Sequence, residues 1–107
     1  MKVPKITASE FRKMVEHRRP FVLLDVREPE EYQTCRIPGS RVISLGDVLK
    51  HMHEFDPEDT IVVHCRSAAR SALAAEWLIK AGFRKVRNLK GGVVAWAEQV
   101  GPSMPRH

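Results

Sequence analysis

Cysteine is scarce in this chain, with two residues among 107. Two cysteines are too few for the disulfide scaffold that stabilises small extracellular domains, so the sequence predicts an apolar core and a reducing compartment. No apolar run has the length of a membrane span, and the N-terminal residues lack the apolar stretch of a cleaved signal. We therefore expect a cytoplasmic protein that does not associate with membranes.

Several ligand-binding patterns are also missing. Histidine and cysteine do not occur at zinc-binding spacing, and Gly91-Gly92 is too short to count as a phosphate-binding glycine motif. Aromatic residues make up only 7% of the chain, and no nucleic-acid-binding module is recognisable. We expect no metal, no organic cofactor and no nucleic-acid partner.

Acidic residues are rare in the C-terminal part of the chain. Residues 61–107 carry eight basic and two acidic side chains, a net charge of +6, whereas residues 21–60 carry a net charge of −5. A basic surface attracts anions over a distance. This distribution favours a small anion or an acidic protein as the binding partner.

Hydrophobic patterning predicts alternating strands and helices. The expected strands are 21–26, 42–43, 60–64 and 85–89, and the expected helices are 8–18, a short one at 27–32, 44–52, 71–81 and 93–100. Thr7 and Glu10 have the spacing of a capping box at the start of the first helix. The pattern predicts one α/β domain over residues 1–107, with three layers (α/β/α) and a mostly parallel sheet.

The peptide HCRSAARS, residues 64–71, connects a buried strand to a helix. Cys65 stands at the carboxyl end of that strand, where the backbone N–H groups and dipole of a helix N-terminus favour an anion. Arg66 and Arg70 add positive charge, which promotes ionisation of a thiol. We predict that Cys65 is a nucleophile acting on an anionic substrate; the alternative is an inert, buried cysteine.

Each basic residue near Cys65 has two possible roles. Arg70 either faces the pocket as an anion ligand, which we favour, or belongs to a solvated helix face. Arg66 either lines the pocket mouth or faces solvent. His64 precedes the nucleophile on a strand, so its side chain should point away from that of Cys65, which argues against a catalytic base.

Asp25, Arg27 and Cys35 lie outside the Cys65 loop and carry other expected roles. Asp25 and Arg27 follow the strand at 21–26, and we expect them to tie that strand to the next helix rather than to perform chemistry. Cys35 could act as a resolving thiol, but its neighbours Thr34 and Arg36 do not show an activating pattern.

Four segments together resemble the rhodanese-like sulfurtransferases. They are Leu24–Tyr32 (LDVREPEEY), Ile37–Ser40 (IPGS), the loop from Cys65 to Arg70, and Leu89–Trp96 (LKGGVVAW). The resemblance implies the rhodanese fold, a persulfide on Cys65, and a substrate-binding loop that surrounds it. That loop comprises Arg66, Ser67, Ala68, Ala69, Arg70 and Ser71.

The same resemblance extends into the C-terminal tail. Trp96 and the segment 102–105 look like the end of the rhodanese domain in adenylyltransferase/sulfurtransferase proteins. This implies a ubiquitin-like sulfur-carrier protein, or its adenylating enzyme, as a partner. The chain departs from the family at Ala68, where a glycine is common and a positive φ would be strained, and at Cys35-Arg36, which replaces a Gly-His pair.

The implied activity is transfer of a sulfane sulfur from an anionic donor such as thiosulfate, through Cys65, to cyanide, a thiol or a carrier protein. One alternative is a persulfide relay module that docks onto a protein and turns over small donors slowly. A less favoured alternative is a dual-specificity phosphatase or arsenate reductase. Those enzymes have five residues between cysteine and arginine, whereas Cys65 and Arg70 are separated by four.

Overall fold

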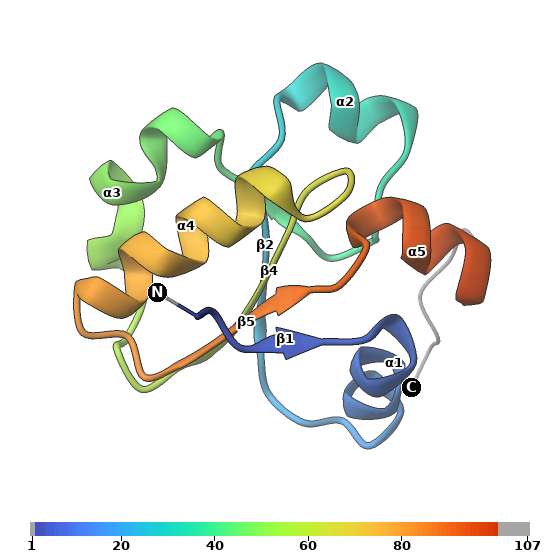
Figure 1. The fold of residues 1–107 in the computed structure, drawn as a ribbon, viewed down its shortest axis with the longest axis horizontal. Coiled ribbons are helices and arrows are strands. Elements are labelled where there is room, and N and C mark those ends of the chain that lie inside the picture. The colour runs from blue at the N-terminus through green and yellow to red at the C-terminus, as the bar shows by residue number, and fades with distance from the viewer. Residues whose placement is uncertain (1, 101–107) are drawn as a thin grey trace.

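The computed structural model describes residues 2–100, which form a five-stranded, entirely parallel sheet (Figure 1). The strand order is β1-β5-β4-β2-β3. The strands are β1 (Lys5–Ile6), β2 (Val22–Asp25), β3 (Arg41–Val42), β4 (Thr60–His64) and β5 (Lys85–Leu89). The helices are α1 (Ala8–Glu16), α2 (Pro29–Thr34), α3 (Val48–His51), α4 (Ala69–Lys80) and α5 (Gly92–Gln99), with 3-10 turns η1 (Leu45–Asp47) and η2 (Met52–Glu54) on either side of α3.

Helices cover both faces of the sheet, which confirms the predicted three-layer α/β/α architecture. Helices α3 and α4 pack on one face, and α1 and α5 pack on the other. Helix α2 lies above the carboxyl ends of the strands, next to the loop that joins β4 to α4 (Figure 1). This edge of the sheet is where parallel α/β domains place their ligand sites.

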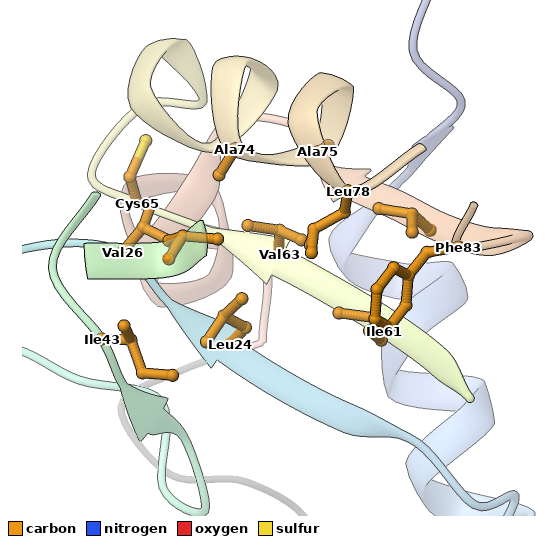
Figure 2. Packing of buried hydrophobic residues seen from close by; sticks show 12 residues of the cluster. Leu24, Val26, Ile43, Ile61, Val63, Cys65, Ala74, Ala75, Leu78 and Phe83 are labelled. Atoms are coloured by element: carbon orange, nitrogen blue, oxygen red, sulfur yellow. The ribbon is translucent and has the colours of Figure 1, made fainter. Parts of the chain in front are cut away.

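Strand β4 is buried on both sides because its side chains alternate between the two cores. Ile61 and Val63 pack against α4, in a cluster that includes Ala74, Ala75 and Leu78 (Figure 2). Val62 belongs to the opposite cluster, which contains residues of α1 and α5. Burial on both faces is typical of a central parallel strand, and it holds the end of β4 in a defined position.

The start of helix α1 has the capping box that the sequence predicts. The N–H of Glu10 donates to Thr7 Oγ1 at 3.0 Å, and the N–H of Thr7 donates to Glu10 Oε1 at 2.8 Å. Both donors would otherwise lack a partner at the helix N-terminus.

The differences from the predicted elements include one additional strand and the bounds of two helices. The additional strand is β1, whose two residues are too few to show the hydrophobic pattern of a strand. They form a strand because they pair with Asn88 and Leu89 of β5. The predicted helix 44–52 is instead α3 with a 3-10 turn at each end. Helix α4 begins at Ala69, earlier than the predicted start at residue 71.

Within residues 2–100, no helix is both long enough and apolar enough to cross a membrane. The tail segment 102–105, which contributes to the family resemblance, lies outside the described residues.

Candidate functional site

The loop from Cys65 to Ala68 lies at the carboxyl edge of the sheet, between β4 and α4. The N-terminus of α5 supports it from one side. The N–H of Val93 donates to the carbonyl of Cys65 at 2.9 Å, and the N–H of Val94 donates to the carbonyl of Arg66 at 3.2 Å. These N–H groups have no partner within their own helix, so the loop carbonyls satisfy them.

Gly92 makes this close approach between α5 and the loop possible. Its φ is +56°, and a Cβ at this position would lie 2.3 Å from the carbonyl oxygen of Cys65 and 2.6 Å from that of Arg66. Only a residue without a side chain fits there. Gly92 is absent from the site residues predicted from the sequence, and the Gly91-Gly92 pair is the signal that could have indicated it.

The sulfur of Cys65 is surrounded by hydrogen-bond donors of its own loop. It accepts the backbone N–H of Ala68 at 3.2 Å and that of Ser71 at 3.4 Å, and it lies 3.3 Å from the hydroxyl oxygen of Ser71. The residue is only 1% exposed, and its sulfur points toward the first turn of α4 (Figure 2). The loop therefore forms a small cradle for a negatively charged sulfur.

The pKa of the Cys65 thiol is lowered from its ordinary value by this cradle. Burial is the largest single influence and raises the pKa, but the hydrogen bonds at the sulfur, among them those from the backbone N–H groups of Ser71, Ala68 and Ser67, together outweigh it. Donors directed at a thiolate stabilise the charged form.

We expect iodoacetamide alkylation of Cys65, followed against pH, to show an inflection clearly below the value of about 8.5 typical of a free thiol. The measurement uses a Cys35→Ser variant, so that Cys65 is the single thiol. An inflection at or above about 8.5 would show that burial dominates over the hydrogen bonds of the loop.

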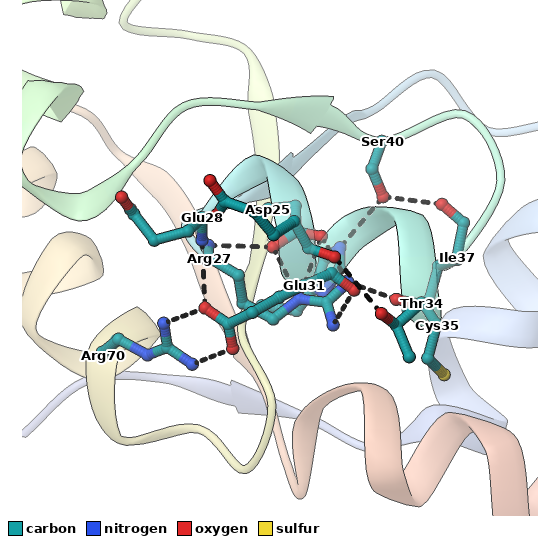
Figure 3. Close-up of polar contacts among 11 residues, drawn as sticks. Asp25, Arg27, Glu28, Glu31, Thr34, Cys35, Ile37, Ser40 and Arg70 are labelled. Atoms are coloured by element: carbon teal, nitrogen blue, oxygen red, sulfur yellow. Dashed lines mark hydrogen bonds and ion pairs between the residues drawn. The ribbon is translucent and has the colours of Figure 1, made fainter.

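Arg70 pairs with Glu31 of α2 rather than standing free as an anion ligand (Figure 3). Its two terminal nitrogens contact the two carboxylate oxygens of Glu31 at 2.7 and 2.8 Å, with both side chains about one-third exposed. The hydrogen bond from Arg70 is the main reason that the pKa of Glu31 falls to about 2. The two residues are 39 positions apart, so the sequence motif around Arg70 did not reveal this partner.

Asp25 and Arg27 form a buried ion pair that joins β2 to α2. The Arg27 guanidinium contacts Asp25 Oδ2 at 2.8 Å and donates to the carbonyls of Cys35 at 2.6 Å and Glu31 at 3.3 Å (Figure 3). These contacts tie the middle and the C-terminal end of α2, which carries Glu31, to the end of β2. The supporting role of Asp25 and Arg27 in the reaction stays a prediction.

His64 is fully buried, and its Nε2 lies 3.0 Å from the hydroxyl of Ser40. Burial is the main cause that lowers its pKa to about 4, so the ring is neutral near pH 7. The structure thus gives His64 a packing environment and no contact with the sulfur of Cys65, as the strand alternation predicts.

A cavity of about 340 Å³ opens beside the loop, and Arg66 lies in its wall. The exposed Cys35 lines the same cavity, together with Arg27 and residues of α5. Among the described residues, no group of three or more His, Cys, Asp or Glu side chains is arranged to hold a metal ion.

Sequence comparison places this chain among known proteins. Residues 7–99 match the rhodanese-like domain family. YrkF of Bacillus subtilis, named as a sulfur carrier protein, is 39% identical over 94 residues, which cover 88% of this chain and 51% of YrkF. MoeZ of Mycobacterium tuberculosis, named as an adenylyltransferase/sulfurtransferase, is 37% identical over 101 residues, which cover 92% of this chain and 26% of MoeZ. The chain thus spans about half of one relative and about a quarter of the other.

Solved structures agree with the sequence comparison. The rhodanese-like domain of an Anabaena protein superposes with a TM-score of 0.83 at 30% identity, covering 95% of this chain and 78% of that one. Further relatives are named sulfurtransferases, which supports a sulfurtransferase role. With a parallel sheet flanked by helices and a family match over almost its whole length, this chain belongs to the rhodanese-like domain family.

Proposed function

We propose that the protein transfers a sulfane sulfur from an anionic donor such as thiosulfate to a thiophilic acceptor, through a persulfide on Cys65. The observation that carries this proposal is the pair of backbone N–H donors, from Ala68 and Ser71, directed at the Cys65 sulfur at the start of α4. A site of this kind suits a reaction in which one sulfur atom carries negative charge before and after each step.

In the first half-reaction, the Cys65 thiolate attacks the outer sulfur of thiosulfate. A new S–S bond forms, the S–S bond of thiosulfate breaks, and its electron pair leaves with sulfite. The negative charge of the thiolate is now on the outer sulfur of the persulfide, and no proton transfer is required. The loop N–H groups stabilise this anion in the way that an oxyanion hole stabilises a developing alkoxide.

In the second half-reaction, a nucleophile such as cyanide or a thiolate attacks the outer sulfur and takes it. The persulfide S–S bond breaks, and its electron pair returns to Cys65 as the thiolate. The names of the relatives, a sulfur carrier protein and an adenylyltransferase/sulfurtransferase, support a carrier protein or its adenylating enzyme as a physiological partner. A much larger kcat/KM with such a carrier than with cyanide would identify the domain as a protein-docking relay.

Mass spectrometry after incubation with thiosulfate tests the proposal directly. We expect one added sulfur atom, mapped to the peptide that contains Cys65, and its removal by cyanide with release of thiocyanate. The same sample is alkylated in parallel to confirm that Cys65 was free. A free Cys65 that acquires no sulfur would contradict the proposed function.

Phosphoryl transfer is the alternative that the loop geometry disfavours. Only four residues separate Cys65 from Arg70, and the Arg70 guanidinium is already paired with Glu31. We therefore expect no more than trace hydrolysis of p-nitrophenyl phosphate. Robust hydrolysis by the unmodified protein would overturn the assignment to sulfur transfer.

We expect the ion pair of Arg70 and Glu31 to set the net charge beside the loop, where an anionic donor binds. Arg70→Ala leaves the Glu31 carboxylate unpaired near the loop, and we expect kcat/KM for thiosulfate to fall by about one to two powers of ten. Arg70→Lys keeps the charge but loses the planar, two-pronged contact, so it should recover only part of this loss. Glu31→Gln should act in the opposite direction on KM, lowering it several-fold.

The double variant Arg70→Ala/Glu31→Gln is the matched control, because it removes both charges together. We expect its kcat/KM to lie much closer to the wild-type value than that of Arg70→Ala alone. Unchanged kinetics in Arg70→Ala would instead assign Arg70 a purely structural contact between α2 and α4.

A further inference from the structure

Asn88 of β5 contacts Ala68 and Ser71, the two residues whose backbone N–H groups donate to the Cys65 sulfur. Its Nδ2 donates to the carbonyl of Ala68 at 3.2 Å, and its Oδ1 accepts the hydroxyl hydrogen of Ser71 at 2.6 Å. The side chain is almost completely buried, with 3% exposure, and its strand neighbour in β4 is Val63. One amide group thus joins the end of the loop to the first turn of α4.

Ala68 is the strained residue of the loop. Its φ is +103°, in the left-handed region that a residue with a Cβ rarely adopts. The N–H of Ala68 donates to the Cys65 sulfur, and its carbonyl accepts from Ala72 as well as from Asn88. Because the same backbone angles orient the N–H and the carbonyl, a group that holds the carbonyl also holds the N–H in place.

Ser71 orients the amide of Asn88. A hydroxyl group has one hydrogen, and here it is directed to Asn88 Oδ1, which leaves Nδ2 facing the Ala68 carbonyl. Without Asn88, a serine in the first turn of a helix has its own nearby backbone carbonyls as alternative acceptors. Loss of the amide would therefore release Ala68 and leave Ser71 without its fixed direction.

We propose that Asn88 is a positioning residue for sulfur transfer: it holds Ala68 in its left-handed conformation and thereby directs the loop N–H groups at the Cys65 sulfur. Asn88 does not touch the sulfur itself. The inference rests on the proposed function of Cys65. It adds a residue outside the Cys65–Ser71 loop to the machinery of that reaction.

Four proteins test the proposal: the parent, Asn88→Ala, Ala68→Gly and the double variant, all with Cys35→Ser so that Cys65 is the single thiol. For Asn88→Ala we expect kcat/KM with thiosulfate and cyanide to fall by about one to two powers of ten, because a small displacement of groups around the reacting sulfur has an effect of this size. Its alkylation inflection should move up by about one pH unit, because the Ala68 N–H is no longer held in place toward the thiolate.

Rescue by glycine separates positioning from general damage. Glycine adopts a positive φ without strain, so Ala68→Gly is the reference for the double variant, and Asn88→Ala should cost much less activity in the Ala68→Gly background than in the parent. In the double variant, we expect glycine to restore most of the lost kcat/KM and to return the alkylation inflection toward that of the parent. If glycine restores neither quantity, the proposal is wrong.

Val86→Ala is the matched control for loss of stability. Val86 lies on the same strand, two residues from Asn88, and is buried in the core, where its partner in β4 is Ile61, four residues before Cys65. It should lower the melting temperature while leaving the alkylation inflection unchanged. An Asn88→Ala variant that also melts earlier but keeps the parent inflection would contradict the proposal. Alkylation needs no sulfur donor. A protein that forms no persulfide would therefore refute the proposed function, while the alkylation inflections would still test the role of Asn88.

Discussion

Replacing Cys65 by serine is expected to abolish sulfur transfer, lowering kcat/KM with thiosulfate and cyanide by about four powers of ten or more, to the background rate. A serine hydroxyl is un-ionised near pH 7 and cannot form a persulfide. Serine is close to cysteine in size and can donate to Ser71, so we expect the melting temperature to change by only a few degrees. Steady-state kinetics and thermal melts of the same preparation provide the measurement.

Cys35→Ser is the control for the cysteine prediction. Cys35 is exposed, and its contact with the site is a hydrogen bond to its backbone carbonyl, which serine preserves. This variant should keep most of the activity. An equal loss in both variants, with folding intact, would require a mechanism in which the two cysteines act together.

Gly92→Ala is expected to produce the largest loss of stability. The added methyl group would lie 2.3 Å from the carbonyl oxygen of Cys65 and 2.6 Å from that of Arg66, and both are backbone atoms. Neither can move away without breaking its hydrogen bond to α5. Together with the positive φ, this clash should cost about 3 kcal/mol or more.

A destabilisation of that size corresponds to a fall in melting temperature of roughly 12 °C or more for a domain of this length. Sulfur transfer should be lost as well, because the loop carbonyls are displaced from α5. Gly46→Ala is the control, because a Cβ at Gly46 would meet no atom within 4 Å. A Gly92→Ala protein with the parent melting temperature would show that α5 shifts to accommodate the methyl group at little cost.

The local pattern of the chain was enough to predict the central strands and the position of Cys65. The apolar run of β4, followed by small residues and a helix, is decided by neighbours within a few positions. Four motifs in a fixed order also indicated the rhodanese-like family, which the comparisons confirm. Local patterning has this power because a parallel strand buried on both faces needs a continuous apolar run wherever it occurs.

The tertiary structure alone decided how the Cys65 loop is supported. Arg70 finds Glu31 across 39 positions, Asn88 reaches Ser71 and Ala68 across 17 and 20, and Gly92 brings α5 against the carbonyl of Cys65. The two-residue strand β1 likewise exists because β5 lies beside it. Such contacts depend on where the sheet and helices bring distant residues together, whereas sequence patterns report only the preferences of neighbouring residues. The place of the loop in the fold could therefore be predicted from the sequence, but the groups that orient it could not.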